Sequence, residues 1–530
     1  MFDTLSTGID GLDALLAGGI RYPADTAAFV FVTGGPGTGK SLLGLEMVVR
    51  AWLSGPEGTT FLYYSVEQSP ESLHKKLESD FDWYRMPASV HALPKEVPHK
   101  LCLEANTERG TTRLVLTQAN TGGLGRRGMQ NMQGAVVDVA WIMAEIGNYR
   151  LAGPVGMVCI DNVGLLLTDL EYFEKRSALL ETRRALMSQK IHGIFVQEEN
   201  DPRDLKMPTA EEFSTDVLIR LAYQEELQSF KARTIEIVKA RHQYHYRGLH
   251  HFSIAGRGMN RDIYLGARNE RGPGLHIYPS VAAQLSIVRD RSAFAVPHRG
   301  SEVVDLGHPD LNVAFLNGTG PTSGSSTVIL AEPGTRYTYL ALRFLAAGRR
   351  AGETTLMVST KEDQDALQRI CAREPALASS CLDEHGAFQN AFGIYYLHPE
   401  FLSPGKLSWD LIRLTVVTGS GEPAQRLAFD NIFRLQDRFP LIRDQGFLIP
   451  ALLDLLRYRS ITPLFIDLVP PGSAKGRTDF NPASYMTTFD NVFHLYLDDE
   501  GGTARPKLRV LKSTANDFQQ IPLPIDYRRT

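Results

Sequence analysis

The feature that most constrains this chain is the run Gly34-Gly35-Pro36-Gly37-Thr38-Gly39-Lys40-Ser41, set between an apolar run, residues 27–32, and an amphipathic segment that begins at Ser41. In this pattern the glycines let backbone N–H groups approach phosphates, the lysine reaches the β- and γ-phosphates, and the final hydroxyl ligates Mg²⁺. The run therefore predicts a phosphate-binding loop between a strand and a helix. Residues Gly35 to Ser41 are the predicted contacts of a nucleoside triphosphate and its Mg²⁺.

Composition narrows the class of protein further. The 530 residues exceed one ordinary core and predict two to four domains. Nucleic acid is a possible partner, but the overall charge does not indicate it, because a net charge of −4 gives no global basic field. The 4 cysteines have no metal-site or disulfide-dense spacing, and no apolar run approaches the length of a membrane span. We expect a cytoplasmic protein without membrane contact.

Landmarks of the phosphate loop recur in the second half of the chain. Pro36-Gly37-Thr38 returns 297 residues later as Pro333-Gly334-Thr335. Further landmarks follow in order: Thr59-Thr60 as Thr354-Thr355, Glu67 as Glu362, and the apolar strand ending in Asp161 as the apolar strand 463–466 ending in Asp467. An ordered set of this kind predicts two copies of one unit.

Each copy reads as strand, loop, helix, strand, a long excursion and a further apolar strand, which predicts an α/β fold with a mostly parallel sheet covered by helices. We expect an N-terminal domain over residues 1–262, a linker over 263–295 marked by glycine and proline, and a C-terminal domain over 296–530. Phosphate sites in such sheets lie at the carboxyl ends of the strands.

Three residues at predicted strand ends are candidates for chemistry in the first copy. Asp161 closes a buried strand and is the expected Mg²⁺-associated carboxylate, although an aspartate there also caps turns. Glu67 ends a neighbouring strand, so its carboxylate can orient an attacking water; a solvated loop glutamate is the alternative. Gln197 ends a third strand and is a candidate sensor of the γ-phosphate.

With these motifs in hand, the whole chain resembles the KaiC family of circadian-clock-type ATPases within the RecA superfamily. The opening residues 5–13 are similar to the family's entry segment, and Glu67-Gln68 is similar to its paired glutamates with the second replaced. The segment 233–241, followed by His245 and Arg247-Gly248, is similar to the family segment whose Lys and Arg reach ATP on the adjacent subunit. The implied fold is two tandem RecA-like domains.

The resemblance implies ATP bound with Mg²⁺ between subunits of a homo-oligomeric ring, typically a hexamer, with Lys239 and Arg241 acting on the neighbour's γ-phosphate. Such a finger offsets charge that develops on the transferred phosphoryl group. The alternative is that both are outward residues of an exposed strand, alternating with Val238 and Ala240. Four nearby histidines, 242, 245, 250 and 251, are more typical of a hairpin surface than of a metal site.

The second loop, Ala331-Glu332-Pro333-Gly334-Thr335-Arg336-Tyr337-Thr338, has lost two of its informative positions. Arg336 replaces the last glycine and crowds the phosphate approach, and Tyr337 replaces the lysine. In the matching finger segment Lys512 remains, whereas Thr514 stands where Arg241 does. We predict a pseudo-ATPase domain without autokinase activity, in which Glu362 and Asp467 survive.

These observations favour a regulatory ATPase that hydrolyses ATP slowly in its first copy and uses its second copy as a scaffold or as a platform for a protein partner. One alternative is a RecA-class DNA-dependent ATPase, recombinase-like or helicase-like, for which the loop 121–133 with Arg126-Arg127 would face DNA. Another is a signalling or defence scaffold in which ATP only locks the oligomer.

Overall fold

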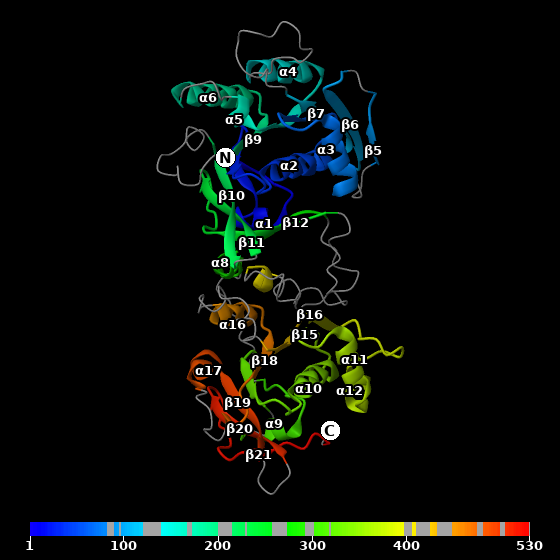
Figure 1. Ribbon diagram of the computed structural model, residues 1–530, viewed down its shortest axis with the longest axis vertical. Coiled ribbons are helices and arrows are strands. Elements are labelled where there is room, and N and C mark those ends of the chain that lie inside the picture. Colours follow the sequence, from blue (N-terminus) through cyan, green and yellow to red (C-terminus); the bar gives the residue numbers. More distant parts are fainter. Residues whose placement is uncertain are drawn as a thin grey trace. The chain divides into compact units, whose positions relative to one another are not determined.

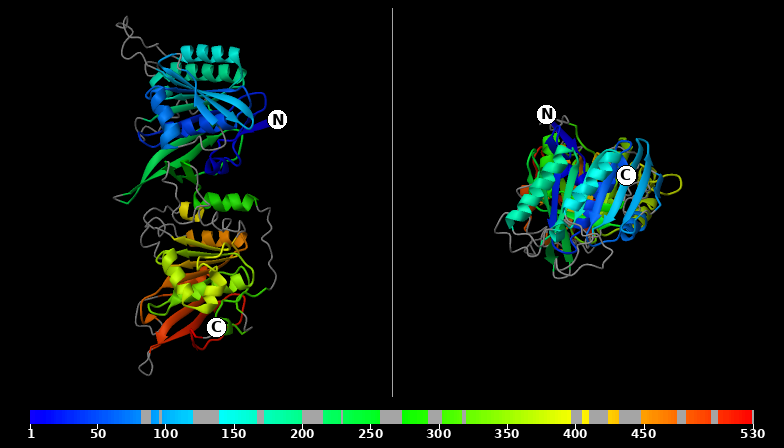
Figure 2. Two further views of the ribbon diagram at one scale, coloured as in Figure 1. Left: turned by 90° about the vertical axis from the view of Figure 1, so that its right-hand side faces the viewer. Right: turned by 90° about the horizontal axis from the view of Figure 1, so that it is seen from above.

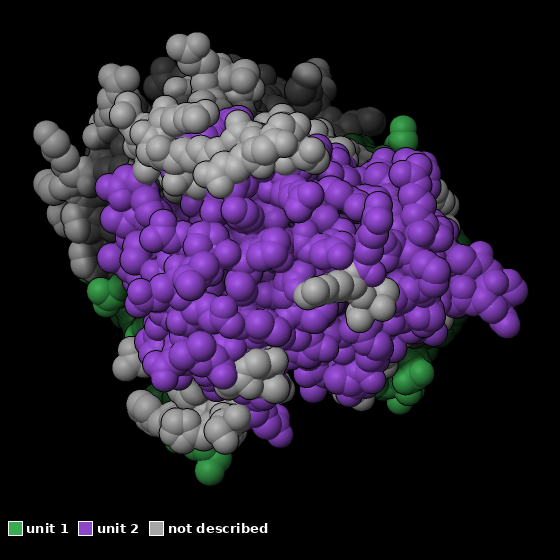
Figure 3. All heavy atoms as spheres, turned by 90° about the horizontal axis from the view of Figure 1, so that it is seen from below, with its two compact units in different colours: residues 1–260, 271–283 green, residues 261–270, 284–530 purple. Residues whose placement is uncertain are grey.

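The computed structural model describes residues 1–81, 89–94, 97–119, 139–166, 172–199, 215–227, 230–256, 273–291, 302–316, 320–396, 405–409, 424–431, 448–473, 481–498 and 504–528. The chain divides into two compact units (Figures 1 and 3). Unit 1 holds residues 1–260 and 271–283, and unit 2 holds residues 261–270 and 284–530. Among the described residues, no helix is long and apolar enough to cross a membrane. The arginine pair 126–127 lies outside the described residues.

Unit 1 is built on a mixed sheet whose middle strands are parallel. Its described strands lie in the order β13-β12-β11-β10-β3-β9-β8-β4-β7-β6-β5, and the run from β10 to β7 is parallel throughout. Their bounds are β3 (Phe29–Gly34), β4 (Thr60–Ser65), β5 (Ser89–Ala92), β6 (Lys100–Thr107), β7 (Gly110–Gln118), β8 (Val155–Asp161), β9 (His192–Glu198), β10 (Val217–Leu227), β11 (Phe230–Ala240), β12 (His250–Ala255) and β13 (Gly274–Tyr278). A separate ribbon pairs β1 (Phe2–Leu5) with β2 (Ile20–Pro23).

Helices cover both faces of this sheet (Figures 1 and 2). Successive strand residues point to opposite faces of the sheet, so Phe29 and Phe31 point to the same face. There they pack in a hydrophobic cluster with residues of α4 and α6, whereas α2 lies on the other face. On that other face a Cβ at Gly44 of α2 would come within 2.9 Å of Val196, so the helix rests closely on β9. The bounds are α1 (Asp10–Leu15), α2 (Lys40–Ser54), α3 (Pro70–Lys75), η1 (Lys76–Asp80), α4 (Val139–Ala152), α5 (Val163–Leu166) and α6 (Tyr172–Ser188).

Unit 2 repeats the arrangement in a smaller sheet. Its described strands lie in the order β16-β15-β17-β18-β14-β19-β20-β21, parallel from β16 to β19. The strands are β14 (Thr327–Ala331), β15 (Thr355–Ser359), β16 (Phe392–Tyr396), β17 (Arg426–Asp430), β18 (Thr462–Leu468), β19 (Asn491–Asp498), β20 (Arg505–Ser513) and β21 (Leu523–Pro524). The helices are α9 (Pro309–Val313), α10 (Tyr337–Arg350), α11 (Gln364–Ala372), α12 (Pro375–Cys381), α16 (Leu448–Tyr458) and α17 (Ala483–Thr488).

The two sheets share one topology, as the internal repeat predicts, and the α/β fold class is confirmed. In both units the loop-bearing strand, β3 or β14, has parallel neighbours on each side, and an antiparallel strand, β11 or β20, follows the last parallel strand. Both last pairs carry a register shift at the same place, after Leu218 in unit 1 and after Val492 in unit 2. A shared irregularity of this kind supports an internal duplication.

The strand register corrects the predicted counterpart of Asp161. The repeated loop aligns Gly34 with Ala331; Gly34 pairs with Glu198, and Ala331 pairs with Leu468. Asp467, one residue before Leu468, is therefore the counterpart of Gln197. Asp161 pairs with Val196, and Asp430 pairs with Ile466, so Asp430 at the end of β17 is the true counterpart of Asp161. The prediction of Asp467 was wrong because two neighbouring strands of unit 2 both carry an aspartate at or next to their last residue, Asp430 in β17 and Asp467 in β18.

The predicted equivalence of Glu67 and Glu362 was also wrong, by one residue. Ser65 pairs with Asp161, and Ser359 follows Val358, which pairs with Phe429, the residue before Asp430. The N–H of Gln68 donates to Ser65 Oγ at 3.0 Å, and the N–H of Glu362 donates to Ser359 Oγ at 3.0 Å. Glu362 thus replaces Gln68, and Lys361 stands where Glu67 does. The second copy has lost the candidate base as well as the loop lysine.

The segment expected to be a linker, residues 263–295, contains regular structure where it is described. Strand β13 pairs with β12 at the edge of the unit 1 sheet, and helix α8 (Val281–Arg291) follows it. Glu46 of α2 accepts the N–H of Leu275 at 2.7 Å and so attaches β13 to the helix that starts at the phosphate loop. The boundary between the two units falls within α8, after Ala283.

Candidate active site

The phosphate loop joins β3 to α2 with the backbone that its glycines allow. Gly37 and Gly39 adopt φ values of 72° and 105°, in the left-handed region that favours glycine. Thr38 Oγ1 donates to the carbonyl of Gly35 at 2.8 Å, which closes the loop on itself. The hydroxyl of Tyr223, from β10, donates to the carbonyl of Gly37 at 2.7 Å. The loop is therefore tied both internally and to the neighbouring strand.

Lys40 is held by a carboxylate that the sequence did not single out. Its Nζ lies 3.0 Å from Oε2 of Glu198, at the end of β9, and donates to the carbonyl of Gly35 at 3.3 Å. Its side chain is only 8% exposed, so the ammonium needs partners of this kind. An incoming polyphosphate would compete with Glu198 for the same ammonium.

Ser41 and Asp161 come together as the sequence predicts for a Mg²⁺ site. Ser41 Oγ donates to Asp161 Oδ1 at 3.0 Å, and the buried Tyr63 hydroxyl donates to Asp161 Oδ2 at 2.8 Å. Burial raises the pKa of Asp161, while the two donated hydrogen bonds act to lower it. A hydroxyl and a carboxylate are the oxygen ligands that Mg²⁺ prefers, so these residues fit the ion and would hold it beside the β- and γ-phosphates.

Glu67 lies beside the residue that follows Asp161. Its Oε1 accepts from Asn162 Nδ2 at 3.5 Å, a long hydrogen bond that orients the carboxylate loosely. Gln197 pairs with Thr33 in the sheet and so lies at the same carboxyl edge. Its buried Oε1 has no hydrogen-bond partner among the described residues, as expected of a group whose partner is a bound ligand or water.

The structure thus gathers Lys40, Ser41, Glu67, Asp161 and Gln197 at one edge of the parallel strands. Sequence reasoning missed Asn162, Glu198 and Tyr63 there. A signal for the first was available, because the dipeptide Asp-Asn ends both β8 and β17, at Asp161-Asn162 and at Asp430-Asn431. Nothing in the sequence marked Glu198, because its role depends on β9 lying between β3 and β8.

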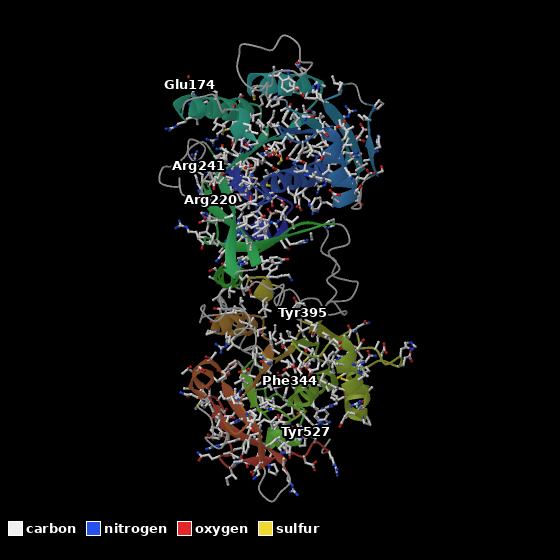
Figure 4. All side chains as sticks on the ribbon, in the orientation of Figure 1. Glu174, Arg220, Arg241, Phe344, Tyr395 and Tyr527 are labelled. Carbon is white, nitrogen blue, oxygen red and sulfur yellow. The ribbon has the colours of Figure 1, made fainter. Side chains whose placement is uncertain are left out.

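Arg241 is separated from this edge by the length of β3, whereas Lys239 pairs with Leu218 of β10, whose partner in β3 is Phe31. Arg241 N donates to the carbonyl of Asp216, and Asp216 Oδ2 accepts from the N–H of Phe29, the first residue of β3. The phosphate loop starts at the other end of that strand, about 16 Å away at a rise of roughly 3.3 Å per residue. Figure 4 labels Arg241, whose side chain is 38% exposed. An arginine side chain cannot span that distance to its own loop.

The second loop keeps the backbone of the first but closes it with its own side chains. Arg336 holds the left-handed conformation of Gly39, with φ 54°, and its guanidinium lies over the rings of Tyr339 and Tyr527 at 5.2 and 5.3 Å. The Tyr527 hydroxyl, near the C-terminus (Figure 4), donates to the carbonyl of Thr335. Burial raises the pKa of Tyr337, which stands where Lys40 does and is 7% exposed.

The four histidines at positions 242, 245, 250 and 251 lie in different surroundings. His250 is fully buried, with its ring nitrogens against the carbonyl of Tyr246 and the N–H of Ser280, each at 3.0 Å, and burial lowers its pKa to about 4. His242 lies 3.7 Å from Asp216. Within the described ranges, no three metal-ligating side chains group together.

Comparisons with known proteins point to one family. The model of the KaiC ATPase domain matches residues 5–90 and 110–261, which carry the loop, Asp161 and the segment 233–241. The first copy is similar to the KaiC ATPase domain, and the chain is KaiC-like. It is 22% identical to circadian clock protein KaiC3 of Synechocystis over 96% of this chain and 87% of that protein.

Two further relatives extend the likeness. Circadian clock protein KaiC2 of Synechocystis is 24% identical over 69% of this chain, and the match spans 53% of KaiC2, about half its length. A UPF0273 protein of Methanopyrus kandleri is 28% identical over 51% of this chain and 96% of its own length. The KaiC-like chain therefore has relatives that it matches nearly end to end as well as relatives about half its size.

Proposed function

We propose that this KaiC-like protein binds and slowly hydrolyses Mg²⁺–ATP at its first copy, at interfaces between subunits of a homo-oligomeric ring. The observation that carries the proposal is the convergence of Lys40, Ser41, Glu67 and Asp161 at one sheet edge while Arg241 lies at the other. A chain that carries the phosphate loop and the finger at opposite ends of one strand completes its site only with a neighbour.

In the proposed site the backbone N–H groups of the loop bind the phosphates, and Lys40 leaves Glu198 for the β- and γ-oxygens. Mg²⁺ held through Ser41 and Asp161 would offset negative charge on the β- and γ-phosphates. Glu67 orients the attacking water and accepts its proton, and Gln197 hydrogen-bonds the γ-phosphate. The neighbour's Lys239 and Arg241 offset the charge that develops on the transferred group.

The second copy serves as a scaffold or a partner platform in this proposal. Tyr337 and Arg336 replace the lysine and the last glycine of the loop, Lys361 replaces the base, and Thr514 replaces the finger arginine. Each change removes a group that the first copy offers to ATP. We infer one nucleotide per chain, no autokinase activity, and assembly that depends on nucleotide through mass action at the first-copy interface.

Steady-state phosphate release tests the proposal, with Lys40→Ala as the blank and with single- or double-stranded DNA added in parallel. Slow release that depends on Lys40 and ignores DNA supports a regulatory ATPase. Strong stimulation by DNA would instead place the protein among DNA-dependent ATPases. Nucleotide binding without any phosphate release above the blank would mean that ATP only stabilises the assembly.

A further inference from the structure

A buried carboxylate lies at the base of the proposed finger. Asp216 is 1% exposed and faces three cationic or ionisable side chains through Oδ1: Arg183 at 2.6 Å, His242 at 3.7 Å and Arg241 at 4.0 Å. Its other oxygen accepts the N–H of Phe29, and its carbonyl accepts the N–H of Arg241. We call Arg183, Asp216, Arg241 and His242 the Asp216 cluster.

The second unit contains the same scaffold without the finger. Asp490 Oδ2 accepts the N–H of Ser326 at 2.9 Å, as Asp216 does from Phe29, and the carbonyl of Asp490 accepts the N–H of Thr514 at 3.0 Å. Arg457 lies 3.5 Å from Asp490 in the place of Arg183. The backbone contacts are common to both copies. What distinguishes the first is a more buried carboxylate, 1% exposed against 27% for Asp490, that faces Arg241 and His242.

We propose that Asp216 is a positioning residue for the Arg241 finger, holding its guanidinium toward the neighbouring subunit's nucleotide. The inference rests on the proposed function, because it requires that Arg241 act in trans. A carboxylate beneath a partly exposed arginine restricts the side chain to fewer conformations before the neighbour's phosphate arrives. A finger without that restraint reaches the same place less often and in a poorer orientation, which lowers turnover.

The test compares Asp216→Asn with Asp490→Asn, its matched control in the other copy. Asparagine keeps an oxygen to accept the Phe29 N–H but loses the charge that faces Arg241. We expect Asp216→Asn to lower turnover by about 10- to 100-fold, with the affinity for a fluorescent ATP analogue unchanged, whereas Asp490→Asn leaves turnover as it is. Equal turnover in Asp216→Asn and the unaltered protein would overturn the inference.

Mixed assemblies separate a finger defect from damage to β3 of the same chain, whose first residue Asp216 contacts. In a ring formed from Asp216→Asn and Lys40→Ala chains, the Lys40→Ala subunit lends an intact finger to the intact loop of its neighbour, so activity returns. A ring of Asp216→Asn and Arg241→Ala chains offers no intact finger to any loop, so its turnover stays as low as that of Asp216→Asn alone. The reverse pattern would mean that Asp216 serves its own loop, and the inference would fail.

The same mixing tells this failure apart from failure of the proposed function. Arg241→Ala chains mixed with Lys40→Ala chains regain activity when the finger acts in trans. Unchanged turnover of Arg241→Ala alone, or no recovery in that mixture, would refute the trans assignment itself. Recovery in that mixture, together with full activity of Asp216→Asn, would support the trans role of Arg241 and show that Asp216 does not position it.

Discussion

Glu46 makes the stability of unit 1 depend on pH in a direction unusual for a carboxylate. The side chain is 1% exposed within α2, where it accepts from Leu275 N at 2.7 Å and lies 3.0 Å from the guanidinium of Arg50. Burial outweighs these partners and raises its pKa from 4.5 to about 7. The folded protein therefore binds a proton at Glu46 more tightly than the unfolded chain does.

The sign and size of the effect follow from linkage. A raised folded pKa contributes stability that is fully present below the unfolded value and is lost as the pH rises through the folded value. The rise of this pKa corresponds to about 3 kcal/mol at low pH, most of which disappears between pH 5 and pH 8. Two buried histidines act in the opposite sense, because burial lowers the pKa of His192 and of His250 to about 4.

Substitution of Glu46 by glutamine isolates this contribution. We expect the unfolding free energy of the unaltered protein, minus that of Glu46→Gln, to fall by about 2 to 3 kcal/mol from pH 5 to pH 8. Histidine effects cancel in that difference because both proteins share them. Urea titrations followed by tryptophan fluorescence report mainly on unit 1, which contains Trp52, Trp83 and Trp141 of the 4 tryptophans.

Glu181→Gln is the matched control, since it makes the same chemical change on an exposed side chain of α6. It reports any effect of the substitution that does not arise from burial. A difference between the unaltered protein and Glu46→Gln that stays constant over this pH range would refute the reasoning. The carboxylate would then be as well solvated, or as well paired, in the folded protein as in the unfolded chain.

Three further predictions concern the two loops. Gly39→Ala should abolish binding of a fluorescent ATP analogue, since its Cβ would meet Ile254 at 2.9 Å at a φ of 105°, whereas Gly147→Ala, with open space around it, should bind normally. Tyr63→Phe should weaken the Mg²⁺ dependence of phosphate release and lower the unfolding free energy by about 1 kcal/mol, because Asp161 loses a buried donor. Equilibrium dialysis should find one nucleotide per chain, unchanged by Arg336→Gly; two would contradict a closed second loop.

The strand register decided questions that sequence similarity left ambiguous. Two apolar runs of unit 2 end in aspartate, and only the pairing of Asp430 with Ile466 shows which of them corresponds to the strand of Asp161. The matching hydrogen bonds to Ser65 and Ser359 place Lys361, not Glu362, at the position of Glu67. Local patterns cannot resolve such cases, because strand order depends on contacts between segments far apart in the chain.

The sequence by itself determined the phosphate loop, the duplicated α/β architecture and the degeneration of the second loop. These follow from local chemistry: glycines where the backbone turns left-handed, a lysine and a hydroxyl at fixed spacing, and apolar runs of strand length. Only the tertiary structure revealed that Glu198 holds Lys40, that Tyr527 closes the second loop, and that Asp216 lies beneath Arg241. Each of these contacts joins residues from separate elements, so their proximity is set by sheet order and not by spacing along the chain.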